Sequence, residues 1–147
     1  MKENYGMEMV GVRLVREAVL EPEKYIANVD DAVETVKKFI SSFDREVTAV
    51  INLNAKGRIL NMQLVSMGSL MQSTVDPGSV YKAALLSNAA SIILFHNHPS
   101  GDPTPSEEDT NVTKRLEEAG RILGVELLDH IIAGRDEYYS FSVENEL

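Results

Sequence analysis

Apolar residues follow two different periods along the chain, and the shorter period marks the strands. Positions 47, 49, 51 and 53 are apolar at every second residue, which predicts a half-buried strand over residues 47–53. A hairpin turn is expected directly after it, at Asn54-Ala55-Lys56-Gly57. A continuous apolar run at residues 92–95 predicts a buried strand that ends near His96. The same reasoning predicts further strands over residues 10–15, 58–65, 125–133 and 138–143.

The longer period, near that of an α-helix, marks three helices. The first has an apolar stripe at positions 33, 36, 39 and 40, and we expect Asp30 or Asp31 to cap it and Ser42 to lie near its end. Asp76-Pro77 predicts the start of a second helix, which continues through Ser87.

The third helix is expected to begin at Thr104-Pro105-Ser106-Glu107, which has the pattern of a capping box with proline at the first helical position. Its core-facing stripe runs through positions 112, 116, 119 and 123, and Ser106 and Asp109 extend that stripe backwards. Helices on both sides of a mixed sheet predict the α/β fold class, with an α+β arrangement of flanking helices.

Composition narrows the setting in which the chain acts. Its 147 residues are 44% hydrophobic, and they are expected to form a single domain over residues 1–147. The sequence shows no cysteine, no leader peptide and no apolar run of the ~20 residues that cross a bilayer. We therefore expect a cytoplasmic protein without a membrane partner. A formal net charge of −9 makes strong nonspecific nucleic-acid binding unexpected, and the sequence does not indicate an oligomeric state.

The candidate chemistry lies at the end of the buried strand. His96 and His98 are two residues apart in extended chain, so their side chains should point the same way. Asp109 lies on the buried stripe of the next helix, where an unpaired carboxylate costs several kcal/mol. The two imidazoles offer it a shared metal ion, so we predict that His96, His98 and Asp109 are metal ligands.

Three protein ligands leave the fourth tetrahedral position open, which is typical of a catalytic zinc site. One Zn²⁺ ion would lower the pKa of a bound water molecule to roughly 7 and polarise a carbonyl group. The lack of cysteine excludes the cysteine-ligated zinc of nucleobase deaminases, and no HExxH helix is present. His130 is expected to lie in the core or directly behind the metal ligands, and not to bind the metal. Asp129 is a candidate to orient a ligand imidazole, and Asp102 is expected in a turn.

The pattern H-x-H, ten intervening residues and D resembles the JAMM motif of JAB/MPN domains. The string HNHPSGDPTPS, followed by a helix and by Leu127-Leu128-Asp129-His130, resembles more narrowly the bacterial RadC-like proteins, and the resemblance covers about residues 44–142. It implies a cytidine-deaminase-like sandwich, a Glu46 that acts as general base and a Ser106 that helps to stabilise an oxyanion. Without the resemblance, Glu46 is more simply a solvated residue at the start of a strand, and Ser106 is equally a helix cap.

Two classes of function follow from these features. The first is a zinc hydrolase of the JAMM type that cuts a peptide or isopeptide bond in a peptide or protein substrate, with Glu46 as the base. The second is a non-catalytic metal-binding accessory module associated with DNA repair or mobile elements. The intact set of ligands together with Glu46 favours the enzyme, while the substrate is not evident from the sequence.

Overall fold

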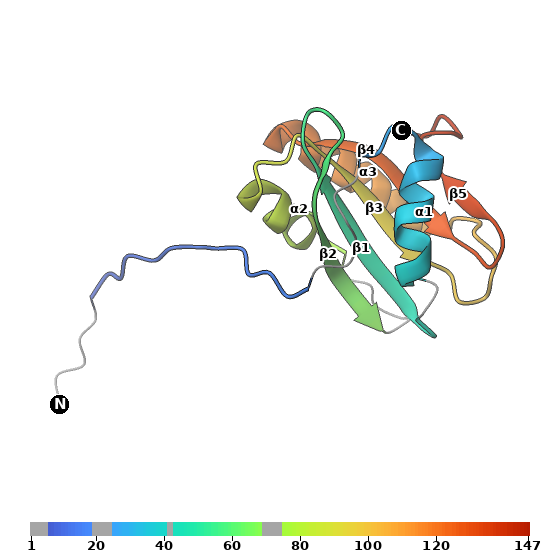
Figure 1. Ribbon diagram of the computed structural model, residues 1–147, viewed down its shortest axis with the longest axis horizontal. Helices are drawn as coiled ribbons and strands as arrows, with labels where there is room; N and C mark the ends of the chain where they lie inside the picture. Colours follow the sequence, from blue (N-terminus) through green and yellow to red (C-terminus); the bar gives the residue numbers. More distant parts are fainter. Residues whose placement is uncertain (1–5, 19–24, 41–42, 69–74) are drawn as a thin grey trace.

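The computed structural model describes residues 6–18, 25–40, 43–68 and 75–147. Figure 1 shows a layered α/β domain from which the N-terminal segment extends. In chain order, the helices and strands of the described residues are α1 (Val29–Ile40), β1 (Glu46–Leu53), β2 (Ile59–Gly68), α2 (Pro77–Leu86), β3 (Ser91–Asn97), α3 (Glu107–Leu123), β4 (Glu126–Ala133) and β5 (Tyr138–Ser140).

The strands form one mixed sheet in the order β2-β1-β3-β4-β5. Strand β1 is antiparallel to both β2 and β3, whereas β3 and β4 are parallel and β5 returns antiparallel to β4. The β1–β2 hairpin turns at Gly57, whose φ of +81° suits a residue without a Cβ atom. Because β3 and β4 are parallel, the chain must cross over between them, and helix α3 makes this connection. The central strand β3 therefore ends beside both β1 and α3.

Helices cover both faces of the sheet, which confirms the predicted fold class (Figure 1). Odd-numbered residues of β1 and β3, such as Ile51 and Ile93, pack with α1 in one core cluster. Even-numbered residues, such as Val50 and Leu94, pack with α2 and α3 in a second cluster. The alternation of side chains continues to the end of β3, so His96 belongs to the face that α3 covers.

The prediction of a strand over residues 10–15 is wrong. Residues 6–18 contain neither helix nor strand, and their side chains are exposed, with Val12 at 71% and Val15 at 83%. In Figure 1 this segment leads away from the sheet. An alternating apolar pattern forms a strand only where a sheet edge supplies backbone partners, and this segment pairs with neither β2 nor β5.

The start of α1 differs from the prediction, because Asn28 and not Asp30 or Asp31 is the capping residue. Asn28 Oδ1 accepts the backbone N–H of Asp31 at 3.0 Å. The Asp31 carboxylate accepts the backbone N–H of Ala27, also at 3.0 Å. The helix ends at Ile40, and the expected end near residue 42 lies outside the described residues.

Strand β5 ends at Ser140, three residues before the predicted end. The buried Asp129 carboxylate accepts the Ser140 hydroxyl at 2.5 Å and the Ser142 backbone N–H at 3.0 Å. These bonds turn the chain away from β4. Asp129 therefore orders this turn, and its hydrogen bonds to described residues include none to a histidine ring, which corrects the expectation that it orients a ligand.

No helix in the described ranges is both long enough and apolar enough to cross a membrane.

Candidate metal centre

Strand β3 brings the two histidines of the H-x-H pattern to one place. His96 is its last residue but one and is 3% exposed, while His98 follows the strand and is partly exposed. His98 stays next to the sheet because its backbone N–H donates to the carbonyl of Ala133 at 2.9 Å. The two Nε2 atoms lie 3.0 Å apart. The prediction that both rings point the same way matches this geometry.

The start of α3 supplies the carboxylate. Ser106 is the N-cap, so the helix begins at Glu107 and not at Pro105, and the capping box joins Ser106 to Asp109. Ser106 Oγ accepts the N–H of Asp109 at 3.1 Å, and Asp109 Oδ2 accepts the N–H of Ser106 at 2.8 Å. Thr104, the expected cap, instead donates to Asp102, which forms the predicted turn. The cap thus fixes the Asp109 carboxylate at the edge of the site.

Glu46 comes from the neighbouring strand. Because β1 is antiparallel to β3, with Thr48 opposite His96, the start of β1 lies beside the end of β3. The buried Asn97 side chain locks this arrangement: its Oδ1 accepts the N–H of Val47 at 2.7 Å, and its Nδ2 donates to the carbonyl of Arg45 at 2.9 Å. One amide therefore holds the backbone on both sides of Glu46.

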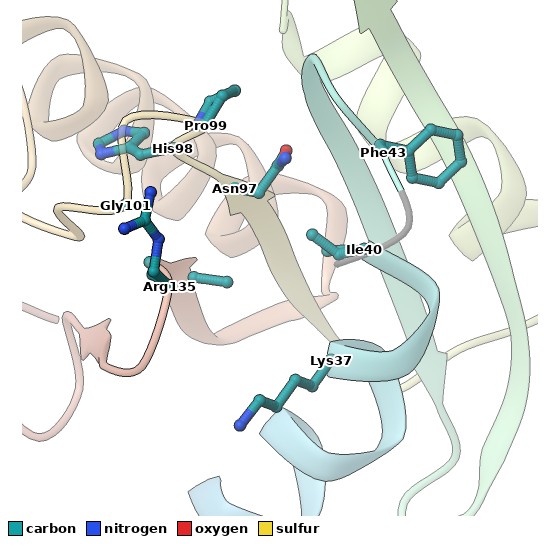
Figure 2. A pocket seen from close by; sticks show the side chains of 10 residues that line it. Lys37, Ile40, Phe43, Asn97, His98, Pro99, Gly101 and Arg135 are labelled. Carbon is teal, nitrogen blue, oxygen red and sulfur yellow. The ribbon is translucent and has the colours of Figure 1, made fainter.

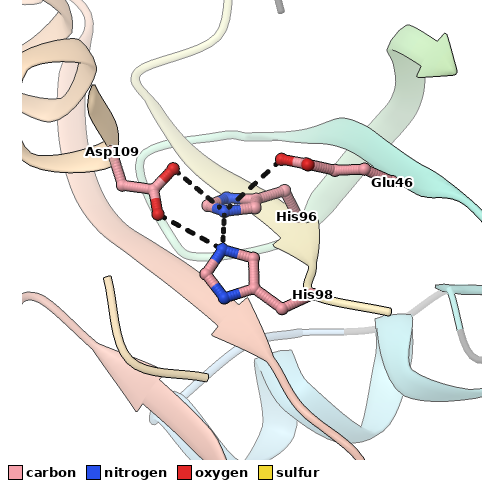
Figure 3. Close-up of side chains that lie close together, drawn as sticks. All are labelled: Glu46, His96, His98 and Asp109. Atoms are coloured by element: carbon pink, nitrogen blue, oxygen red, sulfur yellow. Dashed lines mark hydrogen bonds and ion pairs between the residues drawn. The ribbon is translucent and has the colours of Figure 1, made fainter. Parts of the chain in front are cut away.

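Figure 3 shows that the four side chains converge. One ligand atom from each of Glu46, His96, His98 and Asp109 lies within 4.8 Å of all the others. Asp109 Oδ1 is 3.2 Å from His96 Nε2, and Asp109 Oδ2 is 3.2 Å from His98 Nε2. Ligand atoms of a tetrahedral zinc ion lie roughly 3.3 Å apart, given the usual bond lengths. Glu46 Oε1 is farther out, at 3.9 Å from His96 Nε2.

The hydrogen bond on the far side of His98 decides which nitrogen faces the site. His98 Nδ1 lies 2.9 Å from the backbone oxygen of Asp102, which only accepts. Nδ1 must therefore carry the hydrogen, and Nε2 offers a lone pair when the ring is neutral. The neighbouring Asp109 carboxylate raises the pKa of His98 in spite of burial, because it stabilises a positive charge at Nε2.

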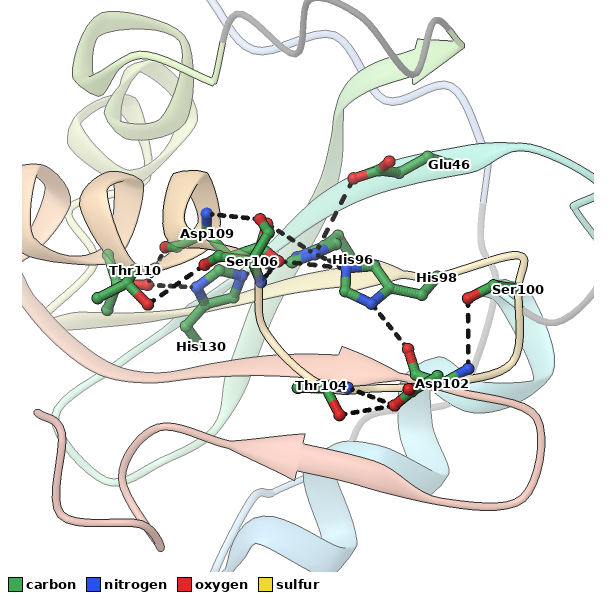
Figure 4. Close-up of polar contacts among 11 residues, drawn as sticks. Glu46, His96, His98, Ser100, Asp102, Thr104, Ser106, Asp109, Thr110 and His130 are labelled. Carbon is green, nitrogen blue, oxygen red and sulfur yellow. Dashed lines mark hydrogen bonds and ion pairs between the residues drawn. The ribbon is translucent and has the colours of Figure 1, made fainter.

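A longer chain of hydrogen bonds orients His96 in the same way (Figure 4). The Thr113 hydroxyl donates to the carbonyl of Asp109 at 2.8 Å, so its oxygen must accept from His130 Nδ1 at 2.6 Å. His130 Nε2 is then an acceptor, and His96 Nδ1 donates to it at 2.8 Å. His96 Nε2 is left with a lone pair. Burial lowers the pKa of His130, which keeps this ring neutral.

These contacts provide a test of whether the residues fit a metal ion. Two imidazole lone pairs and the oxygens of Asp109 face one another at 3.0–3.2 Å. Burial alone would raise the pKa of Asp109, but the neighbouring His96 and His98 lower it, so the carboxylate is charged. A cation relieves the repulsion among these groups, and imidazole with carboxylate suits a divalent metal. The residues therefore fit a metal ion.

Four of the five site residues that the sequence predicts lie in one cluster in the structure. The fifth, Ser106, is the adjacent helix cap. Sequence reasoning misses the roles of Thr113, Asn97 and the Asp102 carbonyl. It expects His130 either in the core or directly behind the ligands, and the hydrogen bond with His96 Nδ1 matches the second. The motif itself gives no signal for Thr113, because its contact with His130 depends on how α3 lies across β4.

A mixed sheet with an H-x-H pair at the end of its central strand, and an aspartate in the first turn of the next helix, defines a JAB/MPN domain. Residues 26–147 match the family model described as a RadC-like JAB domain. The chain belongs to this family, which confirms the resemblance seen in the sequence.

Among its relatives are three bacterial proteins named UPF0758. Those of Syntrophomonas wolfei, Clostridium acetobutylicum and Thermotoga maritima are 46%, 48% and 41% identical over 136, 122 and 140 residues. The matches cover 92%, 83% and 94% of this chain, but 56%, 53% and 61% of the relatives. The chain thus spans little more than half the length of these relatives, whose names state no activity.

We expect Asp109→Asn to weaken the binding of a divalent cation, because it removes the negative charge while keeping an oxygen for the helix cap. In the wild type, a metal at 100 times its Kd should add about 2.7 kcal/mol to the free energy of unfolding. Thermal melts with added Zn²⁺ or Co²⁺, and with chelator, measure this gain. Asp136→Asn, at an exposed residue outside the cluster, is the matched control and should keep the full gain. An unchanged gain in Asp109→Asn would contradict the assignment.

Thr113→Val should lower metal affinity roughly 10- to 100-fold, because the isosteric change removes the hydroxyl that fixes the tautomers of His130 and His96. Thr110→Val is the control, since among the described residues its hydroxyl bonds to the carbonyl of Ser106, the N-cap of α3, and not to a histidine. Chelator competition gives the affinity, and nitrogen NMR of the imidazoles reports the tautomers. Equal metal affinity in the two variants would show that the chain of hydrogen bonds is without effect on the site.

Proposed function

We propose that this protein is a zinc-dependent hydrolase of the JAMM type that cleaves a peptide or isopeptide bond. The supporting observation is the spacing of the cluster: His96, His98 and Asp109 lie 3.0–3.2 Å apart, near the separation of zinc ligands, and Glu46 stands outside at 3.9 Å. A carboxylate at that position is placed for proton transfer and is not needed as a ligand.

His96, His98 and Asp109 would hold the ion through two nitrogens and one oxygen. When bound, zinc supplies a Lewis acid that polarises the scissile carbonyl and makes water more acidic. Glu46 takes a proton from the attacking water and delivers it to the leaving nitrogen as the C–N bond breaks. The products are a carboxylate and an amine, which balances the addition of one water molecule.

Ser106 is able to serve both as helix cap and as oxyanion donor. As N-cap, its Oγ accepts the N–H of Asp109 at 3.1 Å, and this bond does not use the hydroxyl hydrogen. That hydrogen is available for the negative oxygen that develops as the carbonyl is attacked. The cap keeps the hydroxyl beside the Asp109 carboxylate, at the rim of the site (Figure 4).

The proposal extends to the setting in which the protein acts. Its substrate is a peptide or protein and not the backbone of a nucleic acid, since the formal net charge of −9 disfavours binding to phosphates. We propose the cytoplasm as its compartment, in line with the absence of cysteine.

Glu46→Gln should lower turnover by 100-fold or more and leave zinc binding intact, because the amide cannot accept the proton. Metal analysis of the purified protein and hydrolysis of a peptide and isopeptide library give the two readouts. Glu137→Gln, at an exposed residue outside the cluster, is the control and should keep wild-type turnover. Full activity in Glu46→Gln would remove Glu46 as the base. Zinc binding by the wild type without turnover of any substrate would favour the accessory module.

Ser106→Asn should separate capping from catalysis, since asparagine caps helices as well as serine but has no hydroxyl. If the hydroxyl stabilises the oxyanion, this variant keeps its melting temperature and loses about 100-fold in kcat. Ser106→Ala should in addition lose about 1 kcal/mol of stability. Wild-type kcat in Ser106→Asn would limit Ser106 to its capping role.

A further inference from the structure

Strand β2 forms one edge of the sheet, and within the described ranges no strand pairs with its outer side. This edge is ten residues long, whereas β5 at the opposite edge has only three. Two of its apolar side chains, Leu60 and Leu64, are partly exposed. A long edge with exposed apolar side chains readily accepts a further strand, so proteins usually keep such edges covered.

The two faces of β2 present different groups to such a strand. Met62 packs with helix α1 in one core cluster, and Leu64 lies on the same face because side chains alternate along a strand. Gln63 points to the opposite face, where its Oε1 is buried and accepts no hydrogen bond from the part of the chain that the structure describes. A buried acceptor without a donor is destabilising. The edge therefore favours a strand with apolar side chains on one face and a donor on the other.

Residues 10–15 carry this pattern and are themselves exposed. In an extended chain Val10, Val12 and Leu14 share one face, whereas Arg13 lies on the other. The apolar side chains of the segment are exposed to solvent, and the segment leads away from its own sheet (Figure 1). If Val12 and Leu14 are placed toward α1, Arg13 comes to the face of Gln63, and a guanidinium donates hydrogen bonds without accepting any.

A cleft on the α1 face of the sheet does not suit this segment. The cleft has a volume of about 220 Å³ and lies between α1 and the loops that follow β3 and β4 (Figure 2). Ligand pockets usually have roughly 300–1,000 Å³, so it is small for a chain of six residues. Strands β3 and β4, which end beside it, are each paired on both sides. The cleft thus offers no backbone partners to an added strand, whereas the edge of β2 does.

The register at the start of β2 favours the edge of a second copy over the segment's own. Tyr25 forms an isolated antiparallel bridge with Arg58, just before β2 begins. If the pairing continued in register from this bridge, residue 15 would meet Gly68, the last residue of β2, and residues 10–14 would lie beyond the strand. Pairing with another copy is free of this restriction, because the bridge does not set its register.

We propose that two copies of this chain form a dimer by exchanging residues 10–15, each segment adding as a strand to the free edge of β2 in the other copy. The apolar face of the segment then extends the surface beside Met62 and Leu64, and Arg13 donates to Gln63 Oε1. Backbone hydrogen bonds along the edge supply affinity, as in other additions of a strand to a sheet. Two equivalent contacts related by a two-fold axis close the assembly at the dimer.

The variant Val12→Pro/Arg13→Pro tests the segment. Proline lacks the N–H that a paired strand donates, and neighbouring residues of a strand point their N–H groups to opposite sides, so one of the two prolines removes a bond of the ladder. Both residues are exposed in a single copy, so the domain should keep its fold. Sedimentation equilibrium should give a dimer for the wild type and at least a tenfold higher dissociation constant for the variant. Met7→Pro/Glu8→Pro, just before the segment, is the matched control and should dimerise like the wild type.

Leu64→Lys tests the edge, because a lysine on an edge strand disfavours the addition of another strand. It should also raise the dissociation constant of the dimer at least tenfold. Leu128→Lys is the matched control, since Leu128 is 39% exposed against 38% for Leu64 but lies on β4, which is paired on both sides. This control should keep the wild-type dissociation constant.

Mixed labelling identifies the edge that receives the segment. Because the chain has no cysteine, Glu17→Cys carries a single spin label just after the segment. Spin-labelled protein without isotope is mixed with isotope-labelled wild type, so that only contacts between copies broaden the NMR signals. We expect the amide signals of β2 to be broadened most strongly, and those of β5 least among the five strands.

A wild type that stays monomeric at NMR concentrations overturns the proposal, as does a dimer that keeps its affinity in Val12→Pro/Arg13→Pro or in Leu64→Lys. Broadening that is strongest at β5 also overturns it. The same holds if β2 is broadened only when spin label and isotope are in one chain, because the segment would then lie on its own sheet. The inference goes beyond the proposed hydrolase and uses no turnover, so failure of either proposal leaves the other standing.

Discussion

Lone pairs of His96, His98 and Asp109 lie close together between the end of β3 and the start of α3, and hydrogen bonds within the fold hold them in this position. Two imidazole nitrogens face the carboxylate of Asp109 at 3.2 Å, and hydrogen bonds behind each ring prevent either ring from turning its N–H inwards. Backbone carbonyls terminate both sets of bonds, at Asp102 for one ring and at Asp109 for the other. Carbonyls cannot donate, so the direction of every hydrogen bond is fixed by the main chain. A site of this kind is prepared for a cation before the cation arrives.

Much of the fold and of the cluster could be predicted from local sequence, because both depend on periodicity. The alternation in residues 47–53 and the apolar run before His96 correctly indicate β1 and β3, and the motif that follows them is specific. Predictions fail where tertiary contacts decide: residues 10–15 have a strand pattern but no partner, and Asp129 ends β5 early by binding Ser142. The contact of Thr113 with His130 has the same origin, since it joins residues from α3 and β4 that no periodicity relates.

Membership of the RadC-like JAB family supplies the fold and the motif, but the UPF0758 names of the relatives state no activity. The geometry separates three groups at ligand spacing from a fourth group, the carboxylate of Glu46, that stands apart. The chain covers little more than half of the length of these relatives.

Asn97, which lies between the two histidines, requires that the number of residues within the motif stays the same. Its amide turns to the opposite side of the strand and grips the main chain around Glu46, while its neighbours turn to the metal side. A single inserted residue in this triplet would exchange the two sides, so that an amide would face the cation and an imidazole would face β1. Glu46 and the two histidines are therefore positioned relative to one another through three consecutive residues, so the length of this triplet matters as much as its residue types.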